Sequence, residues 1–97
     1  MDNGLVIGAF IKTTDARDQV GLRRIISVCG SGLMVDHFRW KMVKVTNEDG
    51  SVKKQFFAER RPYSSVVSVQ KVIRVYTLDH NLKHISERKV DHGTAAA

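Results

Sequence analysis

The dipeptide Asp49-Gly50 lies between two runs of strand-forming residues, and it constrains the fold more than any other feature of the chain. Asp-Gly between such runs is a strong signal for a β-hairpin, because a tight turn needs the backbone conformations that these residues tolerate. The run at 38–45 is rich in valine and aromatic residues, and the run at 51–58 contains two phenylalanines. The sequence therefore predicts an antiparallel hairpin.

The sequence alone leaves the register of this hairpin open. A two-residue turn would place Val43 opposite Phe56, whereas a three-residue loop would place Met42 there and Trp40 opposite Ala58. Because side chains alternate between the faces of a sheet, a slip of one residue changes which of them are buried. In both registers Phe56 and the phenylalanine after it point to opposite faces, so one fills the core and the other is covered by a second layer or exposed.

The hairpin belongs to a longer stretch, Gly21 to Ala58, that we expect to form consecutive strands joined by tight turns. Residues 22–28 are rich in β-branched side chains, and 33–35 form a short apolar run before the strand at 38–45. Between them, 29–32 contain two glycines within three positions, which supply the positive φ angles of a reversal.

The segment before this stretch predicts one more strand. Residues 5–11 are almost continuously apolar, which is typical of a strand buried on both faces, and Gly8 would mark a bulge or a close crossing of another backbone. Residues 12–19 are polar and short of core residues, so we interpret them as a loop rather than one or two helical turns.

The segment after it begins with a connection at 59–65, because Pro62 lacks a backbone donor and restricts the residue before it. The valine-rich run at 66–78 predicts either one bent strand or a short helical turn at 64–70 followed by a strand at 72–78. After a turn at 79–81, residues 82–90 form a polar last strand that suits a sheet edge.

These elements predict a mainly β protein, a small antiparallel barrel or curled sheet of five to six strands with at most one short helical turn. A chain of 97 residues is long enough for one core, so we expect a single domain over 1–92 and, at 93–97, a disordered tail or a remnant of expression. In size and turn spacing the chain resembles an SH3-like barrel, a fold that hosts many functions.

The composition favours a polyanionic partner. Lys and Arg number 16 against 10 Asp and Glu, giving a net charge of +6. Such a chain suits nucleic acid, an anionic membrane or an acidic protein, and we expect no membrane role, since no basic amphipathic helix and no membrane-spanning run is apparent. The lone Cys29 excludes an intrachain disulfide, and without a signal-peptide pattern the expected location is cytoplasmic.

Most of the basic residues fall on adjacent predicted strands, where cross-strand neighbours are close, so we expect them to gather into one positive surface. Aromatic residues beside them could stack on the bases of a single strand. The candidate nucleic-acid-binding residues are Arg23, Arg24, Arg39, Lys41, Lys44, Lys53, Lys54, Arg60 and Arg61, with Trp40 and Tyr63 as stacking partners. The competing interpretation is a solvated basic face whose aromatic residues all lie in the core.

The predicted function is therefore binding of nucleic acid, DNA or RNA, mainly through its phosphate backbone. The alternative is a protein–protein adaptor or inhibitor that engages an acidic partner through a sheet edge or the Arg60–Tyr63 loop, with a homo-oligomer formed by edge pairing. We predict no enzyme activity, no catalytic residue and no cofactor, because no nucleophile motif or phosphate loop is present. His80 and His84 are four apart but span a turn and a strand, so we predict no metal site.

Overall fold

The structure, a computed structural model, describes residues 5–14 and 21–90. Within these ranges it contains β1 (Phe10–Thr13), β2 (Leu22–Cys29), β3 (Gly32–Thr46), β4 (Val52–Ser68), the 3₁₀ turn η1 (Val69–Lys71), β5 (Val72–Leu78) and β6 (His84–Lys89). The prediction of a mainly β, curled antiparallel sheet with one short helical turn is confirmed. Most of the expected loop at 12–19 and the whole tail at 93–97 lie outside the described residues.

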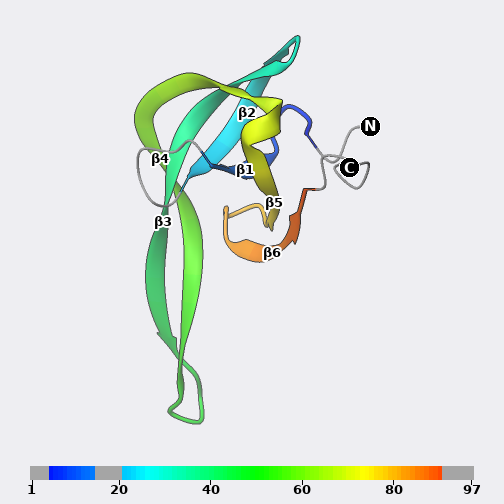
Figure 1. The fold of residues 1–97 in the computed structure, drawn as a ribbon. Coiled ribbons are helices and arrows are strands. Elements are labelled where there is room, and N and C mark those ends of the chain that lie inside the picture. The colour runs from blue at the N-terminus through cyan, green and yellow to red at the C-terminus, as the bar shows by residue number, and fades with distance from the viewer. Residues whose placement is uncertain (1–4, 15–20, 91–97) are drawn as a thin grey trace.

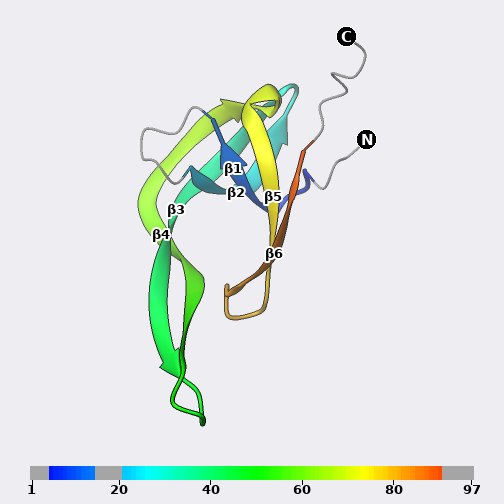
Figure 2. The ribbon, with the colours of Figure 1, turned by 60° about the horizontal axis from the view of Figure 1, so that its bottom comes forward.

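All six strands of the described part belong to one antiparallel sheet in the order β4-β3-β2-β1-β5-β6. Strands β1 to β4 form a meander, and η1 then turns the chain so that β5 returns to pair with β1. The sheet curls until its two ends meet near the turn before β6, where Phe57 bridges Lys83 and the Ala58 N–H donates to the Leu82 carbonyl at 2.9 Å. Figure 2 shows the β5–β6 turn approaching β4.

The central hairpin adopts the register of the three-residue loop. Met42 pairs with Phe56 and Trp40 with Ala58, as that alternative requires. The Asn47 N–H donates to the Ser51 carbonyl at 2.7 Å. Gly50 has a φ of 87°, the left-handed conformation that closes a three-residue loop.

The predicted connection at 59–65 is wrong, because β4 runs through it for 17 residues. Pro62 is tolerated because β4 is the edge strand of the sheet, where a missing N–H need not break the ladder. The ladder also bulges here, since Asp36 pairs with Ser64 and Phe38 with Arg60. Across the same bulge, the runs at 33–35 and 38–45 join into the single strand β3.

The first strand is shorter than predicted and begins later. Val6 and Ile7 are 53% and 66% exposed, and the chain turns there, with the Ala9 N–H donating to the Val6 carbonyl at 3.0 Å. Gly8 occupies this turn at a φ of 95° and donates to the Ile25 carbonyl of β2 at 2.7 Å. Burial on both faces is confirmed for the start of β1 itself, at Phe10 and Ile11.

Two hydrophobic clusters lie on opposite faces of β1, because its adjacent residues Phe10 and Ile11 belong to different clusters. The aliphatic cluster consists of Ile11, Ile25, Leu33, Val35, Val67 and Val72. The aromatic cluster consists of Phe10, Leu22, Phe38, Ala58 and Tyr76, with Trp40, Leu78 and Leu82 packed against it. β1 is therefore the shared wall of two cores.

The C-terminal elements follow the alternative with a helical turn. The predicted strand at 72–78 is confirmed as β5, and the turn before it, η1, is shorter and later than 64–70. Asp79 shapes the next turn, since its Oδ1 accepts from the backbone N–H groups of Asn81 and Lys83 at 2.8 and 2.9 Å. β6 is the other edge of the sheet, as predicted.

Candidate nucleic-acid interface

The distal part of the β3–β4 hairpin projects beyond the body of the protein and carries four lysines (Figure 1). We call Lys41, Lys44, Lys53 and Lys54 the hairpin lysines. Lys44 and Lys54 are direct cross-strand partners, whereas Lys41 pairs with Phe57 and Val45 with Lys53. Since paired residues share a face and successive residues alternate, the hairpin lysines are divided between the two faces of the ribbon.

The hairpin lysines are exposed, and within residues 5–14 and 21–90 none of them forms an ion pair. The loop contains two acidic residues, Glu48 and Asp49, and neither forms an ion pair with a residue in 5–14 or 21–90. The Asp49 carboxylate accepts from the Ser51 N–H at 2.9 Å and from its hydroxyl at 2.6 Å, and these hydrogen bonds lower the pKa of Asp49. The lysine charges are thus available to a ligand.

Two arginines of the predicted surface are matched to carboxylates instead. Arg39 pairs with Glu59 directly across the ladder, with Nε donating to Oε1 at 2.6 Å. Arg60 lies 3.2 Å from an Asp36 oxygen, and its hydrogen bond is the largest cause of the lowered pKa of Asp36. These pairs leave less free positive charge at the base of the hairpin than on its distal part.

Arg23 does not extend the positive surface as expected, whereas Arg24 is exposed. Arg23 is only 2% exposed and its Nη1 donates to the Leu22 carbonyl at 2.8 Å, so it cannot contact a phosphate at the surface. It is on the Ile11 face of the sheet, because it pairs with Ile11 across β1 and β2. Arg24 places its guanidinium 5.4 Å from the centre of the Phe10 ring. The expectation of one continuous positive strip is therefore corrected to a basic distal hairpin.

Tyr63, a predicted stacking partner, lies in the β4 bulge and not beside the hairpin lysines. The Arg61 guanidinium stacks 5.5 Å from its ring centre, and the His37 ring lies 6.3 Å away, edge-on. His37 itself is 2.7 Å from the Ser65 hydroxyl. Arg61 and Tyr63 thus form a separate small surface group on the edge strand.

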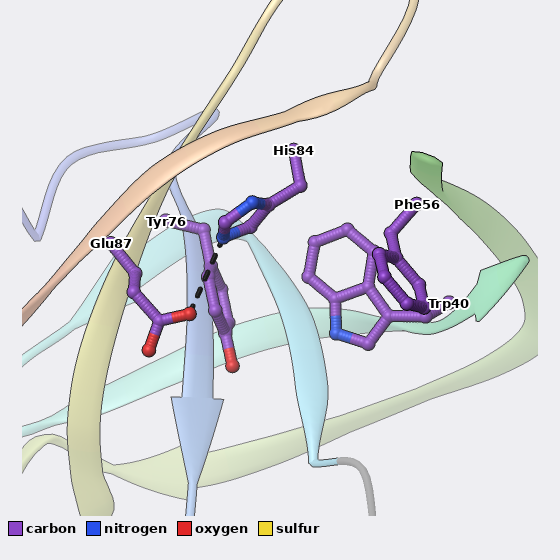
Figure 3. A pocket seen from close by; sticks show the side chains of 5 residues that line it. All are labelled: Trp40, Phe56, Tyr76, His84 and Glu87. Atoms are coloured by element: carbon purple, nitrogen blue, oxygen red, sulfur yellow. Dashed lines mark hydrogen bonds and ion pairs between the residues drawn. The ribbon is translucent and has the colours of Figure 1, made fainter. Parts of the chain in front are cut away.

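Trp40, the other predicted stacking partner, lines a pocket that the sequence did not reveal. The aromatic pocket, as we call it, has a volume of about 380 Å³ and is lined by Trp40, Phe56, Tyr76, His84 and Glu87 (Figure 3). Trp40 and Phe56 come from the β3–β4 hairpin, whereas the other three come from β5 and β6. The pocket therefore lies between the two hairpins, at the place where the ends of the sheet meet.

The rings of the aromatic pocket pack edge to face. The centre of the Trp40 ring is 5.2 Å from that of Tyr76 and 5.5 Å from that of His84, at interplanar angles of 86° and 80°. This arrangement is favourable for aromatic pairs and fixes the walls of the pocket. Phe56 is 42% exposed and forms the open side.

The charge of Glu87 is largely balanced within the protein. Its Oε2 accepts from Arg74 Nη1 at 2.5 Å, and its Oε1 lies 3.3 Å from His84 Nε2. Burial, followed by the nearby Glu87 carboxylate, raises the pKa of the Tyr76 phenol. Tyr76 is thus neutral at physiological pH and acts as an aromatic wall.

The described part of the chain gives no indication of a metal centre. It contains no group of three His, Cys, Asp or Glu side chains placed to hold an ion. The exposed Cys29 has its sulfur 3.8 Å from the Ser27 hydroxyl and no basic group in that contact. None of the helical segments in 5–14 and 21–90 has the length and apolar character needed to cross a bilayer.

Comparison with protein-family models, curated proteins and solved structures finds no match to this chain. The candidate interface is therefore defined by its own geometry, which places lysines without an ion pair to any described residue next to a partly open aromatic pocket.

Proposed function

We propose that the protein binds single-stranded nucleic acid, with the hairpin lysines contacting its phosphates. The observation that carries this proposal is the direct pairing of Lys44 with Lys54. Like charges that face each other across a ladder repel, so this pair destabilises the free hairpin slightly. A phosphate between the two ammonium groups would remove that repulsion, and binding would release counterions from the nucleic acid.

The division of the hairpin lysines between two faces also suits this ligand. A ribbon that projects from the body exposes both faces, so a flexible strand can pass over its edge and contact lysines on each. Such contacts read the backbone and carry little sequence information. Met42 and Phe56, both exposed and paired with each other, offer apolar surface beside Lys44 and Lys54. Bases stack on such surface only when they are unpaired, which favours a single strand.

Fluorescence anisotropy of a labelled oligonucleotide, single-stranded or duplex, tests this proposal. We expect affinity for the single strand to fall steeply as salt rises. The double variant Lys44→Gln/Lys54→Gln should bind more weakly, whereas the control Lys71→Gln/Lys89→Gln removes the same charge elsewhere and should bind normally. The absence of binding at low salt, or an equal loss in both double variants, would overturn the proposal.

The long edge of β4 supports a second candidate, an adaptor that adds a strand from an acidic partner or from another copy of the chain. β4 runs for 17 residues along one end of the sheet, and an edge strand offers unpaired backbone groups. Two measurements distinguish this candidate from nucleic-acid binding: the solution mass from light scattering, and a pull-down after nuclease treatment. A monomer whose captured partners disappear after nuclease treatment would exclude this candidate.

Two further assignments belong to the same proposal. The connectivity supports an SH3-like barrel, because a meander of four strands is followed by a 3₁₀ turn and a fifth strand that returns to β1. A cytoplasmic location is consistent with the single cysteine of the chain, which cannot form an intrachain disulfide.

A further inference from the structure

The aromatic pocket and two of the hairpin lysines share one face of the β3–β4 hairpin. Trp40, Met42 and Lys44 follow one another at intervals of two residues on β3, and their partners on β4 are Ala58, Phe56 and Lys54. Residues two apart on a strand are separated by roughly 7 Å. The same face therefore presents an aromatic site and, next to it along the strands, a pair of positive charges.

We propose that the aromatic pocket receives one unstacked base of the bound strand, with the phosphate of that nucleotide held between Lys44 and Lys54. This inference rests on the proposed function and adds a specific subsite to it. The spacing suits a nucleotide, whose base and phosphate are separated by the intervening sugar. Base–aromatic stacking then adds affinity to contacts that are otherwise electrostatic.

The rings of the pocket are fixed before a ligand arrives. Trp40, Tyr76 and His84 contact one another edge to face, so their orientations are set by mutual packing and by the cluster beneath them. Phe56 is the most exposed of the four rings, at 42%, and it stands on the same side of the pocket as Trp40 (Figure 3). A site with fixed aromatic walls loses little conformational entropy when a flat ring enters.

Glu87 gives the pocket a preference among bases. A carboxylate has about four lone-pair positions, and Arg74 and His84 engage one on each oxygen. The remaining positions accept hydrogen bonds only, which matches the exocyclic amino groups of cytosine, adenine and guanine. Thymine and uracil lack that group, so we expect them to bind more weakly.

The charges around the pocket argue against an organic cation as its occupant. Aromatic walls with a carboxylate are also the elements of a quaternary-ammonium site. Here, however, Arg74 balances the Glu87 charge at 2.5 Å, and the Lys44–Lys54 pair lies on the same face. A cation would meet net positive charge, whereas a nucleotide supplies the phosphate that this charge requires.

Trp40 is the only tryptophan of the chain, so its fluorescence reports on the pocket directly. Three single-stranded oligonucleotides of equal length, oligo-dC, oligo-dT and a fully abasic strand, should be titrated while anisotropy follows binding. We expect saturable quenching of Trp40 by oligo-dC, weaker quenching by oligo-dT and none by the abasic strand. The abasic strand should nevertheless bind, with a similar salt dependence.

A matched pair of variants separates the pocket from general surface effects. Phe56→Ala should lower oligo-dC affinity about tenfold and leave the abasic strand unaffected. Val66→Ala, also an exposed apolar residue of β4 but outside the pocket, should change neither. Far-ultraviolet circular dichroism and the midpoint of thermal unfolding show whether each variant is folded.

Each other outcome has a defined meaning. Binding of oligo-dC without quenching of Trp40 overturns the base subsite and leaves the proposed function standing. Absence of any oligonucleotide binding overturns the proposed function. A titration with dCMP alone then tests whether the pocket binds a base: saturable quenching of Trp40 supports the base subsite, and absence of quenching overturns it. Saturable quenching by tetramethylammonium but not by dCMP identifies a cation pocket and overturns the inference.

Discussion

The two faces of β1 support cores of different kinds. On the Ile11 side the cluster is aliphatic, and five of its six members are at most 1% exposed. On the Phe10 side the cluster is aromatic, with the rings of Phe10 and Phe38 4.9 Å apart, and it extends through Tyr76 and Trp40 to an open pocket. One core is sealed, whereas the other ends at the surface.

This difference indicates a division of labour between the faces. Aliphatic side chains interdigitate closely and exclude water, which stabilises the fold but leaves no room for a ligand. Aromatic rings provide rigid walls and a chemistry that recognises other flat rings. Substitutions on the two sides should therefore separate stability from binding.

The largest effect is expected in the sealed core. Ile25→Ala removes a side chain with no exposed surface and leaves a cavity, so we expect a loss of about 2–5 kcal/mol in the free energy of unfolding. Urea denaturation measures it, and the affinity of the remaining folded protein for oligonucleotide should be unchanged. A large affinity change with little destabilisation would contradict the division between the faces.

The converse substitution acts on the open side. Phe56→Ala truncates a half-exposed ring, so we expect a loss of less than about 1 kcal/mol in stability. Its effect on binding should be larger, about 1–3 kcal/mol for one stacked base. Thermal unfolding and fluorescence anisotropy on the same preparation measure the loss in stability and the loss in binding free energy. A loss in stability larger than the loss in binding free energy would assign Phe56 to the core.

The hairpin lysines give a smaller, salt-dependent effect. For a single strand each neutralised phosphate contributes about 0.7 to the slope of log affinity against log salt. Because Lys44 and Lys54 hold one phosphate between them, Lys44→Gln/Lys54→Gln should reduce that slope by about 0.7. The double variant should also be no less stable than the original protein, because it removes a like-charge pair. An unchanged slope would show that the phosphates bind elsewhere.

The smallest effect concerns Asp36, which accepts hydrogen bonds from Arg60 and Ser64. Its pKa is lowered in the folded state, so the unfolded chain takes up this proton first as the pH falls. The stabilisation is complete above the ordinary pKa near 3.8 and is lost as the pH drops through the lower folded value. Because Arg60 is exposed, this contribution of Asp36 to the free energy of unfolding should stay below about 1 kcal/mol. Asp36→Asn should abolish this part of the acid dependence, measured by urea denaturation between pH 5 and about pH 2.5.

Local sequence signals predicted most of the sheet. The Asp49-Gly50 turn, the glycines at 30 and 32 and the valine-rich run at 72–78 each correspond to a turn or strand of the structure. These signals succeed because turn geometry and strand propensity act over a few residues. Pro62 led to the wrong prediction of a connection at 59–65. The effect of its missing N–H on a strand depends on whether that strand is central or at an edge, and this is determined by the arrangement of the whole sheet.

The candidate site was predicted only in part, for the same reason. Lys44, Lys54 and Trp40 belong to one hairpin, and turn chemistry brings them together. The other pocket residues, Tyr76, His84 and Glu87, come from another hairpin. The local sequence of that hairpin does not predict that the sheet curls and places them against Trp40. Arg23 was misplaced because alternation on β2 turns it inward, toward the face that carries Ile11.

The two hairpins that frame the pocket are fastened by very little backbone. Within residues 5–14 and 21–90 they are joined by the isolated bridge between Phe57 and Lys83, which includes the hydrogen bond from the Ala58 N–H to the Leu82 carbonyl, and Leu82 has a strained φ of 64°. The free energy needed to open this bridge locally is lower than that needed to open the strand ladders on either side of it. The rate of amide hydrogen exchange at Ala58 therefore reports how often the aromatic pocket opens. A ligand that contacts both hairpins would slow this exchange.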